Sequence, residues 1–61
     1  MNQGFECEID DRDWILFEQV GKELVISFQS DEENLGGVTL GSGQVQNLIE
    51  YLLRAKQGLN K

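Results

Sequence analysis

The sequence feature that most limits the possible folds is one amphipathic segment near the C-terminus, at residues 42–58. Its apolar side chains recur at the spacing of a single helix face: Val45, Leu48, Ile49, Leu52 and Ala55. Ser42 is the expected N-cap of this helix, and Gly58 is the expected residue just beyond its C-terminus. We therefore predict a helix over about residues 43–57, with an apolar stripe that needs a surface to cover.

Four segments before the helix have the composition of β-strands. They are residues 3–9, 14–20, 23–30 and 37–40, in which apolar residues alternate with polar ones or β-branched and aromatic types predominate. In the first strand Cys7 should share a face with Phe5 and Ile9, which makes it a small core residue. Residues 10–13 have turn composition, and Gly21 before Lys22 suits a type II′ hairpin.

The order of these elements predicts an α+β fold. We expect a single small domain, an antiparallel β-meander of three to four strands (β-β-β-β-α), with the C-terminal amphipathic helix packed on one face. Sixty-one residues leave no room for a second domain and bury only a thin core. Because Cys7 is the only cysteine and the chain lacks histidine, a partner chain is the expected means of extra stabilisation.

Residues 14–17 are apolar on both faces of their predicted strand. Ile15 and Phe17 should face the helix, which leaves Trp14 and Leu16 on the opposite face. Two explanations stay open. The second apolar patch is an interaction surface, for example a homodimer contact through Trp14 and Leu16, or it is covered by the sheet twist and the N-terminal strand.

Charge is distributed unevenly along the chain. The net charge is −6, but residues 1–33 hold ten acids and two bases, whereas residues 34–61 hold one acid and three bases. The strand half therefore carries −8 and the helix half +2. Such a surface repels phosphate backbones and attracts a basic protein. We expect a protein with a basic surface as the partner, and no direct binding of nucleic acid.

No catalytic, metal or cofactor motif stands out. Cys7 has no histidine to act as its base, and the acids at residues 10–13 and 31–33 lack the order of a calcium loop. The glycines at residues 36–43 match no phosphate-binding spacing. The start of the chain lacks signal-peptide features, and no apolar run approaches the ~20 residues of a membrane span. We expect that the chain is not an enzyme, binds no cofactor or metal and does not contact a membrane. The expected location is the cytoplasm, or the host cytosol if a phage encodes the chain.

The sequence Val38-Thr39-Leu40, followed by Gln44-Val45-x-x-Leu48-Ile49, resembles the last strand and helix of PC4-like single-stranded-DNA-binding domains. Those domains also run β-β-β-β-α, and the likeness covers about a quarter of the chain. The resemblance implies an alternative function: a homodimeric small regulator that binds nucleic acid through its helix end, with Arg54, Lys56 and Lys61. This chain departs from that pattern on its strands, where Glu and Asp stand in place of basic residues.

The composition favours a non-enzymatic acidic protein that occupies a basic surface of a partner, including one that normally holds nucleic acid. Such charge mimicry would act as an inhibitor or regulator of the phage antidefence (anti-CRISPR-like), immunity-protein or antitoxin type. The predicted partner-binding residues are the acids of the strands and turns with one aromatic anchor: Glu6, Glu8, Asp10, Asp11, Asp13, Trp14, Asp31, Glu32 and Glu33. The competing explanation is that these acids only keep a small protein in solution.

Overall fold

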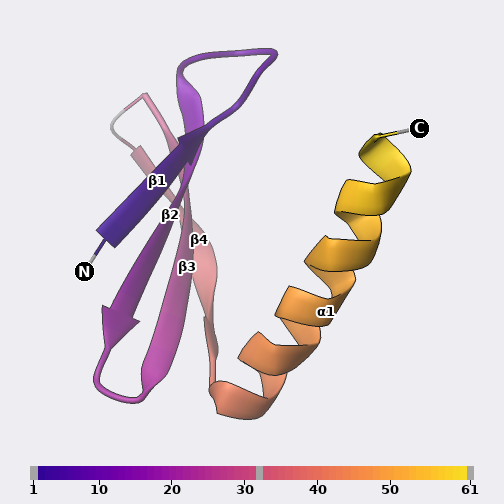
Figure 1. Cartoon of the computed structure of the whole chain (residues 1–61). Helices are drawn as coiled ribbons and strands as arrows, with labels where there is room; N and C mark the ends of the chain where they lie inside the picture. The colour runs from indigo at the N-terminus through magenta and orange to yellow at the C-terminus, as the bar shows by residue number, and fades with distance from the viewer. Residues whose placement is uncertain (1, 32, 61) are drawn as a thin grey trace.

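The computed structural model describes residues 2–31 and 33–60 and contains four strands followed by one helix (Figure 1). The elements are β1 (Asn2–Glu6), β2 (Asp13–Val20), β3 (Glu23–Ser30), β4 (Glu33–Leu40) and α1 (Ser42–Leu59). The strands form one antiparallel sheet in the order β1-β2-β3-β4. The predicted α+β meander with one C-terminal helix is therefore confirmed.

The central hairpin is regular over its whole length. β2 and β3 pair from Asp13 opposite Ser30 to Val20 opposite Glu23. Gly21 has φ +61°, the positive value that the first position of a type II′ turn requires and that glycine adopts without a steric penalty. The predicted hairpin turn thus lies where the sequence indicated.

β4 is twice as long as predicted because a β-bulge lets it start earlier. Gln29 pairs with Asn34 and Phe28 pairs with Gly36, so Leu35 is an extra residue on β4. Gly36 has φ +118°, a backbone conformation open to glycine. Residues 33–36, which lie outside the predicted strand 37–40, therefore belong to the sheet as well.

β1 ends at Glu6, three residues earlier than predicted. The amide of Cys7 donates to the carbonyl of Asp13 at 2.8 Å, and the amide of Asp13 donates to the carbonyl of Asp10 at 3.1 Å. These bonds close a loop over residues 7–12, which turns the chain out of the sheet. Cys7 is exposed and Ile9 is 97% exposed, so the expectation that both are core residues is wrong.

The register divides the sheet into two faces, because residues paired across antiparallel strands point to the same side. One side, here called the apolar face, carries Phe5, Ile15, Phe17, Leu24, Ile26, Phe28, Val38 and Leu40. The other side, here called the Trp14 face, carries Gly4, Glu6, Trp14, Leu16, Glu18, Val25 and Thr39. As predicted, Ile15 and Phe17 lie on one face of the sheet, and Trp14 and Leu16 lie on the other.

The core on the apolar face is thin. Ile26, at 7% exposure, is the single buried apolar residue among residues 2–31 and 33–60. Phe5 and Phe17 meet edge to face, with ring centroids 5.6 Å apart, which is a favourable aromatic geometry. Phe5 nevertheless remains half exposed.

α1 begins one residue earlier than predicted and continues past Gly58. Gly41 is the N-cap, with an extended backbone and no side-chain hydrogen bond, so Ser42 is the first helical residue and the prediction that it caps the helix is wrong. At the other end, the amide of Asn60 donates to the carbonyl of Lys56 at 3.2 Å. Gly58 therefore lies inside the last turn and does not terminate the helix.

α1 lies beside β3 and β4 at its start and then diverges from the sheet (Figure 1). Val45 lines a hollow of about 330 Å³ together with Leu24 and Gln19, which places the start of the helix over the apolar face. Farther along, Ile49 and Leu52 are about half exposed, and none of the helix residues, all of them described, is buried. The helix thus covers only one end of the face that we expected it to close.

Candidate partner-binding site

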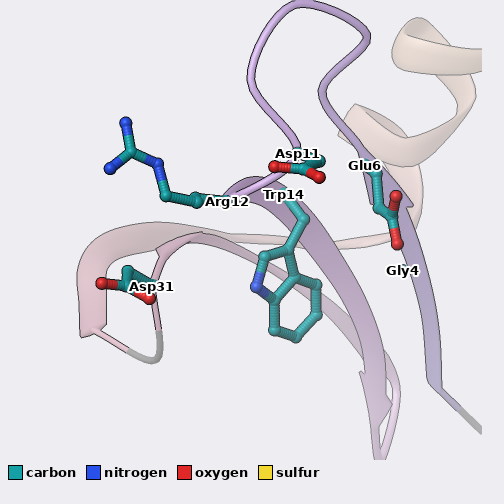
Figure 2. A pocket seen from close by; sticks show the side chains of 6 residues that line it. All are labelled: Gly4, Glu6, Asp11, Arg12, Trp14 and Asp31. Carbon is teal, nitrogen blue, oxygen red and sulfur yellow. The ribbon is translucent and has the colours of Figure 1, made fainter.

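A shallow pocket of about 320 Å³ lies where the Trp14 face meets the loops at one end of the sheet. Residues from three chain segments line it: Gly4, Glu6, Asp11, Arg12, Trp14 and Asp31. Figure 2 shows the indole of Trp14 between Glu6 on one side and Asp31 on the other, with Asp11 above it. The pocket therefore combines an aromatic surface with a rim of carboxylates.

The absence of a side chain at Gly4 makes room for the indole. A Cβ atom at this position would lie 3.2 Å from Cε3 and 3.3 Å from Cζ3 of Trp14, closer than ordinary van der Waals contact. The ring of Trp14 thus packs on the backbone of β1 and is partly covered by it. Of the two explanations for the second apolar patch, the N-terminal strand provides part of the cover, and the rest of the ring remains accessible.

A backbone hydrogen bond places the third carboxylate at the pocket. The amide of Asp31 donates to the carbonyl of Arg12 at 3.0 Å, which ties the turn between β3 and β4 to the loop over residues 7–12. Asp31 has φ +48°, a left-handed conformation that aspartate tolerates better than most residues. Turn geometry therefore places Asp31 at the same pocket as Asp11, which is twenty positions earlier in the sequence.

Asp10 and Arg12 neutralise each other beside the pocket. Arg12 donates from Nε to Oδ1 of Asp10 at 3.1 Å and from Nη2 to Oδ2 at 2.9 Å, and its backbone amide donates to Oδ1 at 3.0 Å. These hydrogen bonds lower the pKa of the Asp10 carboxyl and raise the pKa of the Arg12 guanidinium. Asp10 is thus engaged within the chain, and Arg12 extends away from the indole (Figure 2).

The remaining predicted residues lie elsewhere. Asp13 accepts a hydrogen bond of 2.6 Å from the hydroxyl of Ser30 and shares its face with it, on the side away from the pocket. Glu8 is exposed on the loop and Glu33 at the start of β4, and neither lines the pocket. Glu32 lies outside the described residues. The structure thus groups four of the nine predicted residues: Glu6, Asp11, Trp14 and Asp31.

Sequence reasoning missed Gly4 and Arg12. A glycine inside a strand signals close approach of another group, so Gly4 carried a usable signal. The role of Arg12 depends on the loop conformation, because a two-residue spacing from Asp10 does not by itself specify a bidentate contact. The sequence pattern alone contains no signal for that pair.

The chemistry of the pocket favours a cation. An accessible indole with carboxylates on its rim matches a guanidinium, which forms ion pairs and stacks on aromatic faces. Residues 2–31 and 33–60 contain no group of three or more His, Cys, Asp or Glu that could hold a metal ion. At the helix end Arg54 and Lys56 are exposed, and Lys61 lies outside the described residues.

Within the part that the structure describes, no helix is long and apolar enough to cross a membrane. Comparison with known proteins finds no matching family model, no similar curated protein and no similar solved structure.

Proposed function

We propose that this chain is a non-enzymatic binding protein that receives a cationic side chain of a partner protein, best an arginine, in the pocket at Trp14. The observation that carries the proposal is the convergence of Glu6, Asp11 and Asp31, from three separate segments, around one accessible indole (Figure 2). Acids that only aid solubility have no need to gather at an aromatic ring.

The carboxylates of the pocket are available to an outside cation. Among the described residues the one ion pair joins Arg12 and Asp10, so it leaves Glu6, Asp11 and Asp31 without an internal cation. Exposed ion pairs contribute only about 0.2–1 kcal/mol each. A cation over an indole adds roughly 0.5–2 kcal/mol. A single arginine therefore binds weakly, and useful affinity requires a partner with several basic residues.

The proposed mode of action is occupation of a basic surface. The acidic strand half attracts such a surface over a distance, which raises the association rate at low salt. A partner surface that normally binds nucleic acid fits the same description, and its occupation by this chain would inhibit it. Nucleic acid itself is disfavoured as a ligand of the pocket, because phosphates would face three carboxylates, and the cation in the lining, Arg12, is already paired with Asp10.

The test uses Trp14 as its own reporter, since it is the only tryptophan in the chain. Its fluorescence is followed while a synthetic arginine-rich peptide is added, in the wild type and in the double variant Asp11→Asn/Asp31→Asn. We expect the dissociation constant to rise about 2- to 30-fold in this variant, from the loss of two exposed ion pairs. The control is Glu33→Gln/Glu50→Gln, which has the same net charge but leaves the pocket intact.

Two outcomes would contradict the proposal. An equal loss of affinity in both double variants would mean that diffuse charge, and not the pocket, attracts the peptide. Measurable binding of a random-sequence oligonucleotide at moderate salt would contradict the acidic-surface function and favour nucleic-acid binding through Arg54 and Lys56.

A further inference from the structure

The apolar face and the helix stripe (Val45, Leu48, Ile49, Leu52 and Ala55) are both partly uncovered beyond the first turns of α1. Beyond the first turns of α1, the sheet exposes Phe28 at 48% and Val38 at 49%, while the helix exposes Leu52 at 50%. On the sheet itself, a second hollow of about 390 Å³ is lined by Phe5, Ile15, Phe28 and Leu35 and extends to Glu6 and Trp14, with no helix residue in its lining. Because α1 diverges from the sheet (Figure 1), apolar side chains stay exposed on both elements, and these two exposed surfaces together are here called the wedge.

The exposed area is too large for a compact monomer. A folded monomer of 6.9 kDa exposes about 4,000 Å² by the usual scaling of surface with mass. This chain exposes 5299 Å², which is about 1,300 Å² more. Its radius of gyration of 12.9 Å also exceeds the roughly 10.5 Å expected for 61 residues. The excess points to a surface that another molecule covers.

The size of the excess matches a homodimer interface. A standard interface buries about 800 Å² per partner, and obligate homodimers bury more than 1,000 Å² per partner with a more apolar composition. Covering about 1,300 Å² on each of two chains would give an interface in the obligate range. A core in which Ile26 is the single buried apolar residue of the described ranges needs such an addition for stability.

Charge also favours a second copy over a different partner. The charged strand residues on the apolar face are Asp13 and Glu33, which lie at the end of the sheet next to the turn between β3 and β4. Asp13 is hydrogen-bonded to Ser30. The helix stripe from Val45 to Ala55 is uncharged. A basic partner would gain nothing there, whereas two copies with a net charge of −6 each can meet without facing their acids.

We propose that two copies of this chain form a symmetric dimer in which the apolar face and the helix stripe of each fill the wedge of the other. A two-fold arrangement covers the exposed apolar surfaces of both copies at once, because the same surfaces meet on either side of the symmetry axis. The Trp14 face remains outside this interface. The dimer is therefore independent of the function proposed for the pocket and differs from a dimer through Trp14 and Leu16.

The test measures the molar mass by sedimentation or light scattering in three variants. We expect the wild type to have twice the mass of one chain, and Leu52→Glu to raise the dimer dissociation constant by roughly 100-fold or more, because it buries an unpaired carboxylate. Gln57→Glu is the matched control: it introduces the same charge on the opposite side of α1 and should remain dimeric. Trp14→Glu should also remain dimeric.

A second measurement covers the case in which Leu52→Glu fails to fold. If folding and association are coupled, the melting temperature of the wild type rises with protein concentration. A monomeric wild type whose melting temperature is independent of concentration would overturn the proposal and leave the wedge to another occupant. A dimer that dissociates in Trp14→Glu but persists in Leu52→Glu would overturn it in favour of the Trp14 face.

Discussion

Replacement of Gly37 by alanine tests how closely β4 packs on the central strand. Gly37 lies opposite Ser27, and a Cβ atom there would overlap the carbonyl oxygen of Ile26 and lie 3.1 Å from Cα of Ser27. These are backbone atoms, so relief requires β4 to move away from β3. Such overpacking costs about 1–3 kcal/mol. The lower entropy of the unfolded chain offsets about 0.4–1 kcal/mol. From the middle of each range we expect a net loss of about 1.3 kcal/mol, or a melting temperature lower by about 5–10 °C.

The assay is urea unfolding followed by Trp14 fluorescence, at a fixed protein concentration so that any association is the same for each variant. The control is Gly43→Ala in the first turn of α1, where an added Cβ meets no atom within 4 Å. This variant should gain about 0.5–1 kcal/mol, because alanine is the better helix former. If Gly37→Ala proved as stable as Gly43→Ala, the close approach of β4 to β3 would be refuted.

Three further predictions concern local hydrogen bonds. Ser30→Ala removes the donor to the part-buried carboxylate of Asp13, so unfolding by urea should show a loss of about 1–3 kcal/mol. Ser42→Ala should change the unfolding free energy by less than about 0.5 kcal/mol, since Ser42 makes no capping hydrogen bond. An NMR titration should give Asp10 a lower pKa in the wild type than in Arg12→Ala. Because the folded-state pKa is depressed, this pair contributes stability above the unfolded pKa of about 3.9, and the contribution is lost as pH falls through the folded value.

The elements with strong local signals were predictable. The helix follows from the spacing of Val45, Leu48 and Leu52, and the central hairpin follows from Gly21 between two β-rich segments. The start of β4 could not be predicted, because its pairing depends on a bulge at Leu35 that no local pattern specifies. Tertiary hydrogen bonds, not alternation, decide where β1 ends, which explains the error at Cys7.

The sequence indicated the kinds of residue in the candidate site, but not which individual residues come together there. Net charge and the two-sided apolar run drew attention to acids near Trp14. Which acids meet there depends on the bond from Asp31 to the carbonyl of Arg12 and on the space above Gly4. The engagement of Asp10 by Arg12 removes one predicted acid from the free surface. Local charge counts cannot distinguish such an engaged carboxylate from a free one.

The two faces of the sheet differ in chemistry, since one is apolar and the other carries acids around Trp14. The proposed dimer contact and the proposed binding pocket therefore lie on opposite faces. The proposed dimer covers the apolar face, where Ile26 is the single buried apolar residue of the described ranges. The Trp14 face carries acids whose mutual repulsion would oppose association if they lay in the same interface. A dimer closed through the apolar face would therefore display two acidic pockets on its outer surfaces, one from each copy. Because the pocket and the apolar face lie on opposite sides of the sheet, the free energies of partner binding and of dimer formation should be nearly additive, with coupling expected only through Glu6 and Trp14, which line both the pocket and the hollow beside Phe5. A partner with two basic segments at the right spacing would then bind by avidity without any new contact.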